Sequence, residues 1–217
     1  MEKMPVKRQN TAAKKKLLIA CAVILGLLLI LTCASFIIDY IEGNKSVTSN
    51  EGDREVDYNF YPADFEEDIF QNQDYSELFN EGFIDFKEGS VTLGITKDDA
   101  YKYGADTKLI FDMLDSIIYG DNDRYNQYFS SGYYQNHSEK SEFTMQMLYD
   151  IKIERISSEK VETENGDYTK SIFTVEYKIY KNNGTFRRDI GEGSKKQYIT
   201  LTNQAEQWLI DNISTVN

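Results

Sequence analysis

The most strongly patterned part of the chain is an uncharged apolar run near its beginning, from Leu17 to Ile38. As an α-helix, its 22 residues would reach about 33 Å, which matches the roughly 30 Å thickness of the hydrocarbon core of a bilayer. Lipid offers the backbone no hydrogen-bond partners, so such a run is expected to form one helix. The pattern therefore predicts a transmembrane helix over residues 17–38.

The charges on either side of this run predict its orientation. Six basic residues and one acid lie in residues 1–16, whereas the acids Asp39 and Glu42 follow the run. The positive-inside rule then places residues 1–16 in the cytoplasm, as a basic tail, and the long remainder outside the cell membrane. Two alternatives are a signal peptide cleaved near residues 32–34 and a lipid attached to Cys21, but the apolar run is long for the first and begins too close to Cys21 for the second.

Beyond the run, apolar residues recur with the period of a helix. They form one stripe between Thr96 and Gly120, namely Ile110, Met113, Leu114, Ile117 and Ile118. Thr96 and Asp99 have the spacing of a capping box, and Gly120 provides a stop. Asp121 can then cap a second, shorter helix that ends at Phe129. The spacing predicts a core-facing amphipathic helix followed by a short aromatic one.

From Met147 onward the apolar period changes to two, as in strands with one buried face. Four strands are expected, around residues 147–154, 173–179, 198–202 and 208–210, with turns rich in Asn and Gly between them. Short connections favour an antiparallel arrangement, and the helical stripe would cover one face of the sheet. The predicted fold class is α+β: an N-terminal transmembrane helix, then helices packed on a curved, cone-like antiparallel sheet of about four strands, plus a small N-terminal hairpin.

The same patterns divide the part of the chain after the apolar run into three segments. Residues 39–57 are polar and without period, which is typical of a flexible tether. Residues 58–95 form a lead-in rich in aromatic and acidic side chains, which contains the small hairpin at residues 83–93. Residues 58–80 are too apolar for a free tail and are expected to lie on the surface of the domain. Residues 96–217 form the α+β domain.

Charge and cysteine content restrict the partners and the compartment. The 179 residues after the run carry 35 acids and 18 bases, a net charge of −17, which disfavours nucleic acid as a partner. The only cysteines are Cys21 and Cys33, both inside the run, so the exterior part has neither disulfides nor a thiolate metal site. These features favour a bacterial envelope protein, and the expected partners are the membrane that holds the anchor and other envelope proteins.

The order of these elements resembles a known superfamily. Gly120-Asp121 at the end of the long helix, the aromatic helix YNQYF at residues 125–129, and a closing strand of the type Trp208–Asp211 resemble the nuclear-transport-factor-2-like superfamily, the cystatin-like α+β cone. The resemblance covers residues 98–214. It implies helices packed on a curled sheet, in a family that includes isomerase-type enzymes, small-ligand binders and non-catalytic domains. An anchor ahead of such a domain also resembles assembly factors of conjugation and type IV secretion machines.

The sequence contains no set of residues that predicts a catalytic, cofactor-binding or metal site. The single histidine, His137, lies in a polar run typical of a surface loop. Residues 121–123 begin like a calcium loop but lack its turn glycine and final glutamate, so helix capping explains them better. Residues 191–196 lack the spacing of a phosphate-binding loop and join two strands.

The one basic cluster after the anchor is the candidate partner contact. It consists of Arg187, Arg188, Lys195 and Lys196. Its simplest interpretation is a charge-balanced hairpin tip, and the functional one is a contact for an acidic partner or an anionic wall polymer. Tyrosines not needed in the core could add an adhesive surface patch.

Together these patterns predict a non-catalytic binding or scaffolding domain, held outside the cell membrane, that contacts other envelope proteins. The alternative is a ligand receptor or an isomerase- or dehydratase-type enzyme that uses the concave pocket of the cone. The interior distinguishes the two. A cone filled by its own aromatic side chains leaves no room for a substrate, whereas an open apolar cavity with an ionisable group at its floor favours chemistry.

Overall fold

The computed structural model describes residues 58–79, 84–164, 166–204 and 207–215. None of the helices in these ranges has the length and apolar character that crossing a membrane requires. The predicted basic tail, transmembrane helix and tether, residues 1–57, lie outside the described residues.

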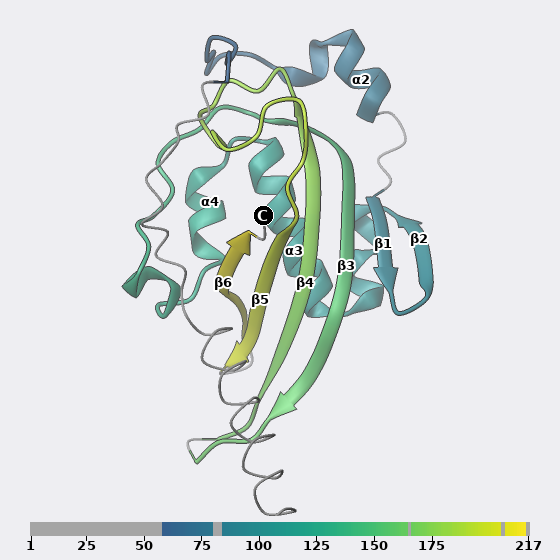
Figure 1. Ribbon diagram of the computed structural model, residues 1–217, viewed down its shortest axis with the longest axis vertical. Helices are drawn as coiled ribbons and strands as arrows, with labels where there is room; N and C mark the ends of the chain where they lie inside the picture. The colour runs from purple at the N-terminus through teal and green to yellow at the C-terminus, as the bar shows by residue number, and fades with distance from the viewer. Residues whose placement is uncertain (1–57, 80–83, 165, 205–206, 216–217) are drawn as a thin grey trace, which may run out of the picture. The chain divides into compact units, whose positions relative to one another are not determined.

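The described chain contains short helices around one sheet. The α-helices are α2 (Gln73–Phe79), α3 (Ala105–Ile118) and α4 (Asn122–Gln127), and the 3-10 segments are η1 (Ile69–Gln71), η2 (Lys97–Tyr103) and η3 (Tyr133–Gln135). The strands are β1 (Ile84–Glu88), β2 (Val91–Ile95), β3 (Met147–Val161), β4 (Tyr168–Tyr180), β5 (Gln197–Gln204) and β6 (Gln207–Thr215). The sheet order is β2-β1-β3-β4-β5-β6, with α3 behind the strands in the view of Figure 1.

The predicted sheet of about four antiparallel strands is wrong, because the sheet has six strands and is mixed. The predicted N-terminal hairpin, β1 and β2, is not a separate unit: β1 pairs in parallel with β3, while all other neighbours are antiparallel. A lone two-stranded hairpin is marginally stable in water. Pairing with β3 places Phe86 beside Ile153, and both side chains are buried.

Helix α3 covers one face of the sheet, as its apolar stripe predicts. All five stripe residues are buried. The helix begins later than predicted, since Gly104 has φ 114° and interrupts the path between η2 and α3. Thr96 makes no side-chain cap to the backbone; its hydroxyl donates to the Asp99 carboxylate at 3.3 Å. Gly120, with φ 67°, ends the helix as predicted.

A buried ion pair fastens the start of α3 to the sheet. Asp106, in the first turn of α3, accepts hydrogen bonds from Arg155 of β3 at 2.7 Å and from the Ser171 hydroxyl of β4 at 2.8 Å. Arg155 also donates to Glu88 of β1 at 2.5 Å. A negative charge near a helix N-terminus is favoured by the helix dipole. The pair therefore ties α3, β1, β3 and β4 together.

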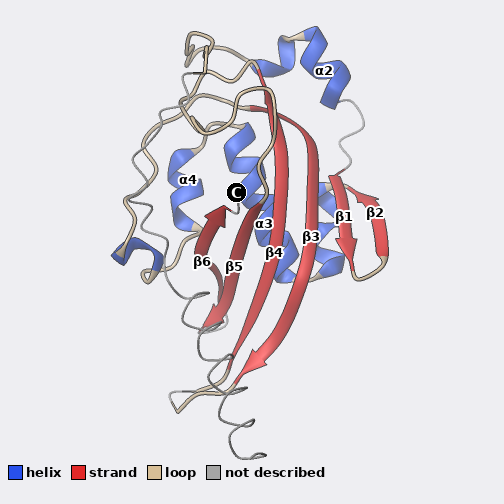
Figure 2. Cartoon of the chain, viewed as in Figure 1, coloured by secondary structure: helices blue, strands red, loops and turns tan. Residues whose placement is uncertain are grey.

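The loops before β3 and after β4 gather at the end of the sheet where α2 lies, opposite the β3–β4 turn (Figure 2). Residues far apart in the sequence meet at this end, and the candidate site lies there.

Candidate functional site

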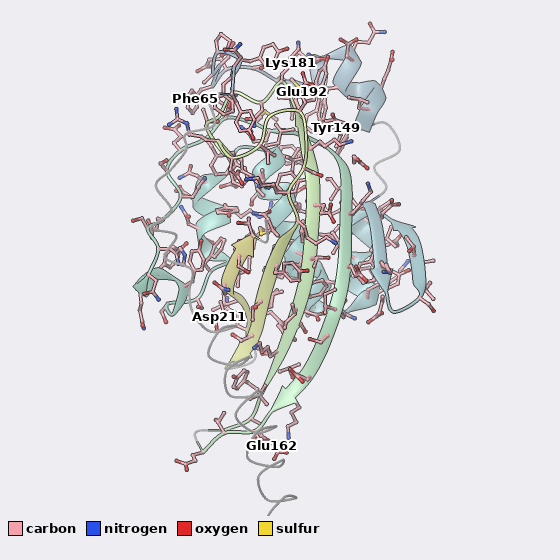
Figure 3. The ribbon with its side chains drawn as sticks, viewed as in Figure 1. Phe65, Tyr149, Glu162, Lys181, Glu192 and Asp211 are labelled. Carbon is pink, nitrogen blue, oxygen red and sulfur yellow. The ribbon has the colours of Figure 1, made fainter. Side chains whose placement is uncertain are left out.

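All four predicted basic contact residues fall in the long loop between β4 and β5, residues 181–196. Figure 3 labels Lys181 and Glu192 of this loop and Tyr149 of β3 at the same end of the sheet, while Glu162 of the β3–β4 turn lies at the other end. The candidate site is therefore built on the loop end of the domain.

Side-chain amides hold this loop in one shape. The buried Asn182 side chain donates to the carbonyls of Arg187 at 3.1 Å and Ile190 at 2.9 Å, and accepts from the Gly184 amide at 2.9 Å. Asn side chains commonly stabilise turns in this way. The loop is a built structure with its own buried polar centre, which the simple interpretation as a hairpin tip did not include.

Arg187 is part of that centre. Its side chain is only 7% exposed, and it forms a two-pronged ion pair with Asp189, Nε to Oδ1 at 2.8 Å and Nη2 to Oδ2 at 2.7 Å. The guanidinium lies 5.3 Å from the centre of the Tyr177 ring. Burial lowers the pKa of Arg187, but the hydrogen bonds with Asp189 outweigh it and raise the pKa overall. Burial raises the pKa of Asp189, but bonding to Arg187 leaves it below its usual value.

The other three basic residues have different surroundings. Lys195 Nζ lies 3.8 Å from the Asp189 carboxylate, and Lys196 Nζ lies 3.1 Å from that of Glu176 on β4. Arg188 is exposed, and the described part of the chain gives it no ion pair. The four side chains therefore do not form one free basic surface. Contact with a partner through Arg188 stays a prediction.

The lead-in segment packs directly against this loop. The Tyr61 amide donates to the Asn182 carbonyl at 3.0 Å, and the Tyr58 hydroxyl donates to the Asp189 carbonyl at 3.4 Å. The rings of Tyr58 and Phe60 lie against two glycines of the loop. A Cβ atom would meet the Tyr58 ring at 2.7 Å if placed on Gly191, and the Phe60 ring at 2.9 Å if placed on Gly184.

An open groove of about 810 Å³ lies between the lead-in, the loop and the adjoining ends of β3 and β4. We call it the aromatic groove. Its lining includes the aromatic residues Tyr58, Phe60, Tyr61, Tyr149 and Tyr180. Its polar lining includes Asn59, Lys181 and Glu192. The groove therefore combines large ring surfaces with hydrogen-bonding groups, which is typical of a recognition surface.

Beside α4, the space between the helices and the sheet is filled by aromatic side chains, whereas a hollow of about 690 Å³ lies between α2, α3 and the adjoining ends of β1 and β3. The Tyr125 ring makes edge contacts with Phe143 and Phe186, at ring-centre distances of 5.9 and 5.6 Å. The cavity left beside them is about 210 Å³. Lys140 lines it, donating to the Phe186 carbonyl at 2.5 Å, and burial together with the charge of Arg187 lowers the pKa of Lys140.

Residues weighed for catalysis or metal binding have structural contacts. His137 stacks on the Tyr133 ring at 4.2 Å and is exposed, as its polar surroundings predict. Asp121 caps α4 by accepting from the Arg124 amide at 2.9 Å. Asp211, which ends the closing-strand motif, likewise has a structural contact, since it accepts from the Ser130 hydroxyl at 2.5 Å. No group of three or more His, Cys, Asp or Glu side chains in the described ranges could hold a metal ion.

The sequence predicted that the aromatic lead-in lies on the surface of the domain, but not that it docks on the loop after β4. Two features of the sequence could have indicated it: the aromatic residues Tyr58 and Phe60, and the glycines at positions 184 and 191 of the loop. Nothing in the sequence, however, pairs these two distant segments. No family model matches the chain, and no curated protein shows significant sequence similarity to it.

Proposed function

We propose that this chain is a single-pass, membrane-anchored protein of a bacterial envelope whose extracytoplasmic domain binds another envelope component without catalysing a reaction. The apolar run at residues 17–38 and the basic tail at residues 1–16 support the anchor and its orientation. The order of α3 and α4 before four antiparallel strands supports the resemblance to the nuclear-transport-factor-2-like superfamily. Confinement at a membrane raises the local concentration of a binding domain near its partners.

One observation carries the choice of binding: the open aromatic groove on the outside of the domain. The cavity of about 210 Å³ beside the aromatic core is below the range of roughly 300 to 1,000 Å³ typical of ligand pockets, while a hollow of about 690 Å³ lies between α2, α3 and the adjoining ends of β1 and β3. The aromatic groove, at about 810 Å³, is open and lies on the outside. A wide aromatic surface suits an extended partner better than a small substrate.

A small-ligand receptor is the second candidate, and the surroundings of Lys140 favour it. This half-buried ammonium lines the interior cavity close to buried tyrosine rings. A screen of small carboxylates by thermal shift tests it. A ligand that raises the Tm of the wild type but not of Lys140→Met supports this candidate.

Site-specific photo-crosslinking in cells tests the leading proposal. A photoreactive residue at position 61, in the aromatic groove, is compared with one at position 101, an exposed tyrosine on η2 outside the groove. We expect position 61 to capture envelope material in the membrane fraction and position 101 to capture much less. Recovery of the protein alone from position 61, at every light dose, would count against a binding role.

A further inference from the structure

The aromatic groove presents tyrosine rings that are accessible and held in place. Tyr61 is 56% exposed, and Tyr149 and Tyr180 are partly exposed. Lys178 Nζ lies 5.7 Å from the Tyr149 ring centre, and the Tyr180 hydroxyl donates to Asp74 of α2 at 3.3 Å. Rings that are already ordered lose little conformational freedom when a ligand stacks on them.

The groove carries no net charge, in contrast to the rest of the exterior chain. Its lining contains one cation, Lys181, and one anion, Glu192, whereas the chain after residue 38 has a net charge of −17. An anionic polymer would be repelled by the acidic surroundings, and a cationic one would find no excess negative charge in the groove. The electrostatics therefore favour an uncharged ligand.

The ring faces and polar groups together match carbohydrate chemistry. The face of a tyrosine ring is electron-rich, and the C–H bonds on one face of a pyranose ring carry a slight positive charge, so the two stack. Sugar hydroxyls around that ring need donors and acceptors, which tyrosine hydroxyls, Asn59, Lys181 and Glu192 can supply. A proline-rich peptide also stacks on aromatic grooves, but its free backbone groups are acceptors only and offer no hydroxyl donor to the Glu192 carboxylate, whereas sugar hydroxyls both donate and accept.

We propose that the aromatic groove binds an uncharged carbohydrate chain. This rests on the proposed extracytoplasmic location, because polysaccharide of the envelope lies on that side of the membrane. The loop glycines serve the same site: by admitting the rings of Tyr58 and Phe60, they let the lead-in form one wall of the groove.

Calorimetric titration of the full-length chain in detergent micelles with a soluble chito-oligosaccharide tests the proposal. The groove variants are Tyr61→Ala and Tyr180→Ala. The matched control is Tyr101→Ala, because Tyr101 is 62% exposed and has a lysine 5.9 Å from its ring centre, as Tyr180 has at 5.8 Å. We expect the wild type to bind, each groove variant to bind at least tenfold more weakly, and the control to bind as the wild type does.

Three results would overturn the carbohydrate assignment: no binding by the wild type, equal weakening in Tyr101→Ala, or binding of a proline-rich peptide that depends on Tyr61 in place of the sugar. If Tyr180→Ala does not fold, Tyr61→Ala decides, since its exposed ring contributes little to the core. Labelling of Ser194→Cys in intact cells separates the two proposals. External labelling without sugar binding removes only the carbohydrate assignment, whereas labelling that needs lysis removes the proposed location.

Discussion

Replacing Gly191 by alanine tests whether the lead-in is docked by the shape of the loop. The new Cβ would lie 2.7 Å from the Tyr58 ring, so the ring must move. Gly193→Ala is the matched control, because a Cβ there meets nothing within 4 Å. Both glycines have backbone angles outside the left-handed region, so the two variants differ mainly in the collision.

The expected magnitude follows from the contacts that hold the lead-in. The Tyr61 amide bond to the Asn182 carbonyl and the Tyr58 hydroxyl bond to the Asp189 carbonyl each contribute about 0.5–1.5 kcal/mol. Loss of about 1.4 kcal/mol increases the undocked population about tenfold. Global stability should change much less, because undocking is a local opening.

Hydrogen exchange of the full-length chain, read on peptides that cover residues 58–65, provides the assay. We expect exchange at the Tyr61 amide to be about tenfold faster in Gly191→Ala, at about 1.4 kcal/mol per tenfold, and unchanged in Gly193→Ala. Equal exchange rates in the two variants would refute the inference that the shape of the loop holds the lead-in in place.

Three further predictions concern the buried charges. Asp106→Ala should lower the free energy of unfolding by about 1.5–3 kcal/mol, because it removes the buried carboxylate that accepts from Arg155 and Ser171 and leaves Arg155 only Glu88 as an ionic partner. The exposed Asp98→Ala should leave the free energy of unfolding unchanged, and denaturant titration measures both. Arg187→Ala should destabilise the domain by about 2 kcal/mol more than Arg188→Ala, since only the first loses charged hydrogen bonds; equal Tm values would contradict this. The pKa of Asp189 is lowered in the folded state. Its contribution to stability is therefore complete above the unfolded pKa of about 3.9 and is lost as the pH falls through the folded pKa. The Tm difference between wild type and Asp189→Asn should shrink on acidification, and a difference that grows would contradict this prediction.

Local patterns in the sequence predicted the elements well. The stripe from Ile110 to Ile118 identified the core face of α3, and Gly120 identified its end, because helical period and left-handed backbone are properties of neighbouring residues. The period of two found all four strands of the meander, although β3 and β4 extend further than their apolar alternation does.

Contacts between distant residues could not be predicted in this way. The parallel pairing of β1 with β3 adds the hairpin to the sheet, but no short-range pattern specifies a parallel neighbour. Asp106 lies outside the apolar stripe of α3, yet Arg155 of β3 makes its burial favourable. The basic cluster was judged by its charge, and Asp189, two residues from Arg187, turned out to be the partner that buries it.

The central claim, a binding domain held outside the membrane, is tested most directly by the side from which the loop can be labelled. Ser194 is exposed in the loop between β4 and β5, and the only native cysteines, Cys21 and Cys33, can be replaced by serine. Intact bacteria that produce this chain with Ser194→Cys are treated with a membrane-impermeant maleimide. We expect labelling in intact cells that equals labelling after lysis. Labelling only after lysis would contradict the account.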